Sequence, residues 1–138
     1  NTCSLLQGLP LSYLHIFPFS RRKGTAAASF SGQNHATKIK ERCAVLKKLD
    51  EAKRREFYGR FIGKDAEVLV ESGHPPAGWV GHKATGQLSG WPDNYIPVVL
   101  EPDGVLSNTI VKARLTGLKG GYVVAVLVNG WPITVREE

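Results

Sequence analysis

The chain has no methionine and only two cysteines, Cys3 and Cys43. Two cysteines are too few for a disulfide framework or a self-contained metal site, which excludes small stapled folds and zinc modules. No stretch of the sequence approaches the roughly 18 apolar residues of a membrane span, and the h-region and cleavage site of a signal peptide are also missing. The expected compartment is therefore the cytoplasm.

Familiar catalytic patterns are missing too. The sequence has neither a phosphate-binding Gly-x-x-x-x-Gly-Lys run nor a Gly-x-Ser-x-Gly elbow. His15 lies in an apolar run typical of a hydrogen-bonded core histidine, whereas His74 and His82 lie in a Gly/Pro-rich stretch typical of exposed loops. Cys43 falls on an apolar helix stripe, as a small packed side chain does. We therefore expect no catalytic residue and no metal ligand in this chain.

What the chain does have is a hydrophobic fraction of 42%, enough for a core, and a net charge of +6. The charge is uneven: residues 1–33 carry three basic and no acidic residues, residues 34–64 carry ten against four, and residues 65–138 carry five against eight. A basic first half indicates a polyanionic partner. The competing interpretation is a solvated helix face, which also produces runs of charge.

The hydrophobic pattern changes near Gly63. Before it, residues 1–8 look like the end of a helix, residues 11–17 like a strand buried on both faces, and residues 36–58 like a helix with one narrow apolar stripe. The run 26–28 is compatible with one helical turn. After it come short β runs at 65–71, 95–100, 109–115 and 121–128, with turns expected at Gly104, Gly117 and Gly120. Four or five such strands in about 70 residues predict a small closed barrel.

The candidate binding residues lie on this barrel. Asn94 and Tyr95 offer an amide and a stacking ring next to each other. Lys112 and Arg114 alternate on one face of a predicted strand, and Lys119 falls in the next turn. A core aromatic is the competing interpretation for Tyr95, and a solvated strand face is the competing interpretation for the two strand cations.

Two further motifs carry a resemblance to a known family. Residues 17–27 read Phe-Pro-Phe-Ser-Arg-Arg-Lys-Gly-Thr-Ala-Ala, close to a Phe-x-Tyr-Ser-x-Arg-x-Gly-Thr-x-Ala motif with Phe19 in place of Tyr. Residues 90–95 read Gly-Trp-Pro-Asp-Asn-Tyr, close to Gly-x-Thr-x-Asn-Tyr with Pro92 in place of Thr. In this order, with a basic segment between them, they resemble the C-terminal part of the radical S-adenosylmethionine methylthiotransferases that modify tRNA.

The resemblance implies an α+β fold in three parts. Residues 1–33 would be the remnant of a catalytic α/β barrel (strand and loop), residues 34–62 a basic linker helix, and residues 63–138 a TRAM domain. A TRAM domain is a small antiparallel five-stranded β-barrel that binds RNA. The stretch 72–90 is longer than a compact TRAM domain needs, and residues 131–138 are expected to cover an edge or to trail off.

The resemblance also implies a partner and a chemistry. The partner would be the tRNA anticodon stem-loop, held through Asn94, Tyr95, Lys112, Arg114, Lys119, Arg21 and Arg22. The parent enzyme would use two 4Fe-4S clusters and S-adenosylmethionine, with cluster cysteines outside this chain, so we expect the chain to be a fragment that is inactive alone and holds no cofactor. Residues 15–20 and 93–95 look most like the branch that acts on threonylcarbamoyladenosine.

Other interpretations remain open. Relatives of this family act on isopentenyladenosine or on a ribosomal-protein aspartate, so the β-domain is alternatively a protein-docking module. It is also compatible with a structural lid on the catalytic domain. The apolar run 11–17 would expose an unpaired edge, so we expect it to pair with another chain or with the β-domain.

Overall fold

The computed structural model describes residues 1–71, 88–101 and 107–128. The chain forms two compact units, Asn1–Arg54 and Arg55–Glu138, whose boundary falls within a long helix. Several predicted features lie outside the described residues: most of the stretch 72–90 with His74 and His82, the expected turn at Gly104, and residues 131–138.

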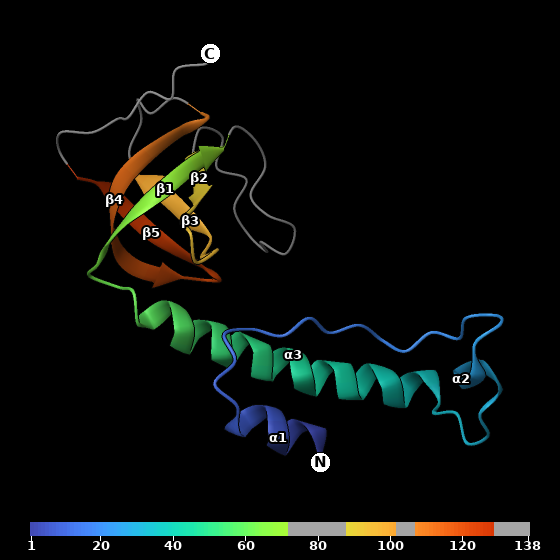
Figure 1. Ribbon diagram of the computed structural model, residues 1–138. Coiled ribbons are helices and arrows are strands. Elements are labelled where there is room, and N and C mark those ends of the chain that lie inside the picture. Colours follow the sequence, from blue (N-terminus) through green and yellow to red (C-terminus); the bar gives the residue numbers. More distant parts are fainter. Residues whose placement is uncertain (72–87, 102–106, 129–138) are drawn as a thin grey trace. The chain divides into compact units, whose positions relative to one another are not determined.

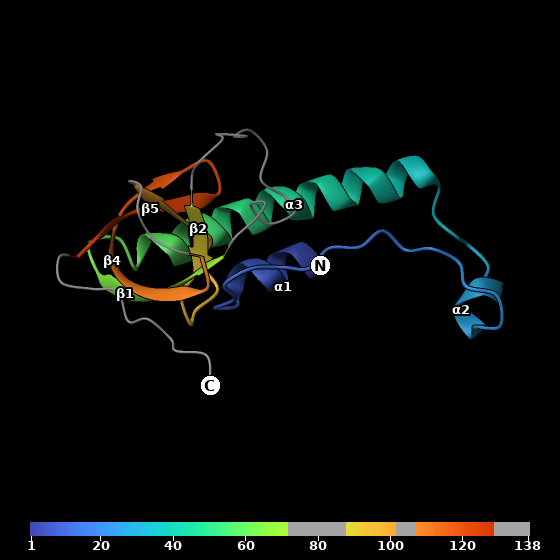
Figure 2. The same ribbon diagram turned by 90° about the horizontal axis from the view of Figure 1, so that it is seen from above.

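The first unit contains three helices, α1 (Thr2–Gly8), α2 (Ala26–Ser29) and most of α3 (Ala36–Gly59) (Figures 1 and 2). The Asn1 side chain caps α1 by accepting a hydrogen bond from the Ser4 amide at 3.1 Å, which satisfies one of the free donors of the first turn. The predicted helices at 1–8 and 36–58 are confirmed, and the run 26–28 does form a helical turn.

The strand predicted at residues 11–17 is wrong. These residues run extended but form no strand pairing within the part of the chain that the structure describes. Two side chains of α3 hold this segment and the residue Leu9 before it instead. The Leu14 amide donates to Asp50 Oδ1 at 2.6 Å, and the Lys53 ammonium donates to the carbonyl of Leu9 at 2.7 Å. A run rich in apolar and aromatic residues predicts an extended backbone, but it carries no information about which partner strands are present.

The second unit is a closed barrel of β1 (Asp65–Glu71), β2 (Leu88–Trp91), β3 (Val98–Glu101), β4 (Thr109–Lys119) and β5 (Tyr122–Leu127) (Figure 1). The strands follow the order β1-β2-β3-β5-β4 around the barrel. The predicted closed barrel of five strands is confirmed. The barrel is mixed rather than wholly antiparallel, because the neighbouring strands β3 and β5 run parallel. The intervening strand β4 carries the chain back in the opposite direction between them.

The strand bounds differ from the prediction in informative places. The first strand begins and ends as predicted, whereas β2 was not predicted and β3 begins later because residues 92–96 form a turn. Gly117 does not end β4 but lies at its register shift, after which the strand continues to Lys119. The turn expected at Gly120 is present.

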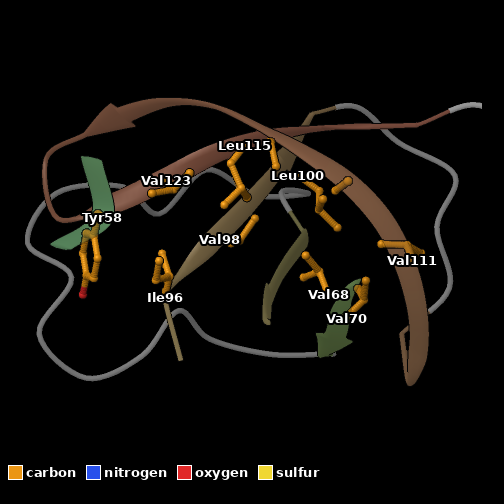
Figure 3. Packing of buried hydrophobic residues seen from close by; sticks show 11 residues of the cluster. Tyr58, Val68, Val70, Ile96, Val98, Leu100, Val111, Leu115 and Val123 are labelled. Carbon is orange, nitrogen blue, oxygen red and sulfur yellow. The ribbon is translucent and has the colours of Figure 1, made fainter. Parts of the chain in front are cut away.

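The core of the second unit lies inside the barrel. Alternate residues of the strands point inward, among them Val68 and Val70 of β1 and Val111 and Leu115 of β4 (Figure 3). Tyr58, from the last turn of α3, closes one side of this cluster. Gly90 of β2 is buried where a Cβ would collide with the backbone of β1, so only glycine fits at this crossing.

Candidate nucleic-acid interface

The turn between β2 and β3 presents an aromatic side chain, Tyr95, to solvent. The Tyr95 amide donates to the Pro92 carbonyl at 3.0 Å, and the Ile96 amide donates to Asn94 Oδ1 at 3.2 Å. Tyr95 is 76% exposed, whereas the next residue, Ile96, is fully buried. The competing interpretation of Tyr95 as a core aromatic is therefore wrong: the turn buries its neighbour and leaves the ring in solvent.

The outer face of β4 carries the two predicted strand cations. Lys112 and Arg114 are both exposed and lie opposite the acidic residues Glu67 and Asp65 of β1. Arg114 Nε donates to Asp65 Oδ1 at 2.7 Å, and Lys112 Nζ lies 4.0 Å from Asp65 Oδ2. The hydrogen bond from Arg114, with its positive charge and that of Lys112, holds the pKa of Asp65 below its ordinary value. The two cations thus share the carboxylate of Asp65, and with Glu67 included the four side chains carry equal numbers of positive and negative charges.

The other predicted cations are exposed and belong to different units of the chain. Lys119 ends β4 and pairs with Tyr122 across the turn. Arg21 and Arg22 belong to the first unit, where the Arg22 carbonyl accepts hydrogen bonds from the Thr25 amide and hydroxyl. This turn fixes the backbone of Arg22 and leaves both guanidinium groups in solvent.

An apolar row on the outer barrel surface was not predicted. Leu69 of β1 pairs with Trp91 of β2 on one side and with Ile110 of β4 on the other. Leu69 is 44% exposed, and the Trp91 indole donates to Glu71 Oε2 at 3.1 Å. The signal for this row was available in β1, where Leu69 occupies an outward position between the inward Val68 and Val70. The sequence contains no such signal for Trp91, because its strand, β2, was not predicted.

The first unit also differs from the sequence-based interpretation. His15 is exposed, not a core histidine, and its ring lies beside those of Tyr13 and Phe17. Sequence reasoning missed Lys53 and Asp50 as structural anchors because both look like ordinary charges on a helix. Lys53 is only 8% exposed.

The described residues contain no group of three or more His, Cys, Asp or Glu side chains placed to hold a metal ion. Cys3 and Cys43 are both free thiols. Two cysteines do not fit an iron–sulfur cluster, which is typically held by four thiolates. Within the described parts of the chain, no helix combines the length and the apolar character needed to span a bilayer.

Curated proteins that resemble this chain share one activity in their names. Threonylcarbamoyladenosine tRNA methylthiotransferase MtaB of Rickettsia prowazekii is 34% identical over 128 residues, which is 93% of this chain and 27% of the relative. The protein of the same name from Aquifex aeolicus is 42% identical over 70 residues, 51% of this chain and 17% of the relative.

A third relative carries a different substrate in its name. The tRNA-2-methylthio-N(6)-dimethylallyladenosine synthase of Thermobifida fusca is 33% identical over 73 residues, 53% of this chain and 15% of the relative. The chain thus spans about a quarter or less of the length of these relatives. No protein-family model matches it. The similarities nevertheless confirm the predicted resemblance: over nearly its whole length this chain is related to a part of the tRNA methylthiotransferases.

Proposed function

We propose that this chain is the RNA-holding region of a tRNA methylthiotransferase that adds a methylthio group to C2 of a modified adenosine beside the anticodon. Threonylcarbamoyladenosine is the favoured base, because the relatives from Rickettsia prowazekii and Aquifex aeolicus, at 34% and 42% identity, carry that name. The parent enzyme would carry out radical chemistry with two 4Fe-4S clusters and S-adenosylmethionine, in the cytoplasm, and this chain would be inactive alone.

The single observation that carries the RNA-holding role is the exposure of Tyr95. An aromatic ring that stands in solvent on a small five-stranded barrel is a platform for an unpaired base, since every base has a face that can stack. The bases of an anticodon loop are unpaired and accessible, as single-stranded recognition requires. Exposed cations would then contact the phosphates and set the register of the RNA.

The proposed division of labour follows the three expected segments. Residues 1–33 would complete the catalytic domain, residues 34–62 would form the basic linker helix, and residues 63–138 would form the TRAM barrel. The exposed rings of the first segment support this assignment. Tyr13, Phe17, Phe19 and Phe30 are large side chains that the described part of their own unit leaves in solvent, which is typical of a surface that another domain covers.

The experiment is fluorescence anisotropy with an anticodon stem-loop, with and without threonylcarbamoyladenosine, at two salt concentrations. Binding through phosphates should weaken steeply as salt rises. Lys112→Ala with Arg114→Ala should weaken binding at low salt and reduce the salt dependence. Lys47→Ala with Lys48→Ala removes the same charge from α3 and is the matched control. Absence of binding at low salt would contradict the proposal.

A second candidate function is supported by the apolar row of Leu69, Trp91 and Ile110. Glu67 and Glu71 lie on the same strand as Leu69 and would repel phosphates, so this surface suits a protein better than RNA. In this case the barrel would dock a protein substrate or the catalytic domain itself. Such binding should change little with salt and should weaken in Leu69→Ser, whereas binding of RNA to the same variant should not change.

A further inference from the structure

The backbone at Tyr95 is in an unfavourable conformation. Its φ angle is +56°, in the left-handed region that bulky residues avoid because Cβ crowds the neighbouring carbonyl. Elsewhere in the described residues, positive φ occurs at Asn108 and at four glycines, residue types that tolerate it. A tyrosine at this position therefore costs free energy that asparagine or glycine would not.

Packing does not explain why tyrosine occupies this strained position. Its side chain is 76% exposed, whereas Pro92 and Ile96, which bracket the turn, are buried. The buried flanks require the chain to reverse here, but they place no demand on the side chain at position 95. Backbone strain that is not offset by burial of the side chain is typical of functional sites.

Asn94 holds this conformation in place. Its Oδ1 accepts a hydrogen bond from the Ile96 amide at 3.2 Å, and the Tyr95 amide is tied to the Pro92 carbonyl at 3.0 Å. The peptide groups on both sides of Tyr95 are thus fixed. The Asn94 side chain is therefore engaged with the turn that carries the ring, a role that the sequence did not indicate.

We infer that Asn94 is a positioning residue that holds Tyr95 in a strained left-handed turn, so that its exposed ring is preorganised to stack on an unpaired nucleobase. This inference rests on the proposed function and specifies how the barrel would contact a base. A fixed backbone and a side chain with two rotatable angles lose little freedom on binding. Position 95 would therefore trade stability of the free barrel for affinity.

Three substitutions at position 95 separate the effect of the aromatic ring from the effect of the backbone strain. Tyr95→Phe keeps both, Tyr95→Ala removes the ring but keeps a Cβ in the left-handed region, and Tyr95→Asn removes the ring and relieves the strain. We expect Tyr95→Asn to have a higher urea midpoint than Tyr95→Ala. Anisotropy with the anticodon stem-loop should show wild-type affinity for Tyr95→Phe and a loss of roughly 5- to 100-fold for Tyr95→Ala and Tyr95→Asn.

A double-mutant cycle tests the role of Asn94. Asn94→Ala should weaken binding, and adding Tyr95→Ala to it should cause little further loss, because Asn94 acts through the ring. Asn94→Ser retains an acceptor for the Ile96 amide and should recover part of the affinity. Additive losses would overturn the positioning role, since they would show that Asn94 contacts RNA independently.

The outcomes also distinguish this inference from the proposed function. If the wild-type chain binds the stem-loop in a salt-sensitive way but Tyr95→Ala binds equally well, the stacking inference is overturned and the proposed function stands. If the wild-type chain does not bind at low salt, the proposed function fails and the stacking inference with it. Equal urea midpoints for Tyr95→Ala and Tyr95→Asn would overturn the claim that the backbone at position 95 is strained, whatever the measured affinities for RNA.

Discussion

The two compact units of this chain are stabilised by different means. The barrel unit encloses a continuous cluster of valine, leucine and isoleucine side chains, most of them fully buried (Figure 3). Among the described residues of Asn1–Arg54, the one buried residue is Lys53, and large apolar side chains such as Phe17, at 81% exposure, face solvent. The barrel therefore has a core of its own, whereas the first unit depends on a few polar contacts.

The difference indicates whether each unit needs contacts with another domain or chain to be stable. A closed barrel leaves no strand edge and needs no partner to satisfy its backbone. The extended segment 11–17 has neither a core nor a partner strand. Asp50 of α3 holds it through the Leu14 amide, and Lys53 of α3 holds Leu9 just before it. This contrast is expected if the first unit belongs to a larger domain and the barrel folds independently.

The largest effect is expected where β2 passes closest to β1, at Gly90. In Gly90→Ala, the new Cβ would lie 2.7 Å from Val68 Cγ1 and in contact with the Leu69 carbonyl, so β1 and β2 would have to separate. The loss in free energy of unfolding should be about 3 kcal/mol, near the upper end of overpacking costs. Urea unfolding followed by circular dichroism would measure it.

The matched control for this substitution is Gly117→Ala. Gly117 also lies in a strand, but an added Cβ there meets nothing within 4 Å. Its effect should stay within about 0.5 kcal/mol. Equal losses at the two positions would contradict the view that the close approach of β1 and β2 leaves no room for a side chain at position 90.

A smaller and local effect is expected in the first unit. Lys53→Met keeps the length of the side chain but removes the donor to the Leu9 carbonyl. The local loss should be about 2 kcal/mol, typical of a hydrogen bond from a charged group. Hydrogen exchange should become faster in residues 1–14, while the urea midpoint of the barrel should not change. The control, Lys47→Met, replaces an exposed lysine, and a change in barrel stability in Lys53→Met would contradict the separation of the two units.

Much of the barrel could be predicted from the sequence because its information is local. Val68 and Val70 occupy alternate positions between Glu67 and Glu71, so β1 was predicted at its observed bounds. The strand β2 escaped notice because a four-residue Leu-Ser-Gly-Trp run beside a Gly/Pro-rich stretch gives no periodic signal. The parallel pairing of β3 with β5 depends on closure of the whole barrel, which no short window contains.

The candidate site was predictable in residue type but not in role. Tyr95 and the strand cations were identified by their chemistry, and the structure places all of them at the surface. The left-handed backbone of Tyr95 was not predictable, because it results from burying both flanks of one turn. Likewise, nothing local distinguishes the buried anchor Lys53 from the exposed lysines before it on α3.

The exposed rings of the first unit should affect association more than stability. Phe17→Ser with Phe30→Ser should change the free energy of unfolding by less than about 0.5 kcal/mol, because both rings are mostly exposed. We expect the wild-type chain to self-associate through this surface and the double variant to do so less, as sedimentation velocity over a range of concentrations would show. A wild-type chain that stays monomeric at every concentration, and loses residues 1–33 rapidly to a protease, would contradict this prediction.

The smallest effect concerns the ion pairs of the barrel. Arg114 and Lys112 hold the pKa of Asp65 below its ordinary value of 3.8. A carboxyl whose folded-state pKa is lowered contributes stability above the unfolded value, and this contribution is lost as the pH falls through the folded-state pKa. Asp65→Asn should therefore be slightly less stable than the wild type at pH 7, and the difference should shrink below about pH 4.

The same substitution should have the opposite effect on RNA. Asp65 competes with phosphates for Arg114 and Lys112, so its neutralisation should free both cations and raise the affinity for the anticodon stem-loop by a few-fold at low salt. Glu56→Gln, which loses an exposed ion pair with Arg60, is the control that removes the same charge elsewhere. Equal gains in the two variants would show that net charge alone sets the affinity. A gain confined to Asp65→Asn would place the phosphate contacts on the outer face of β4 and distinguish that face from the basic helix.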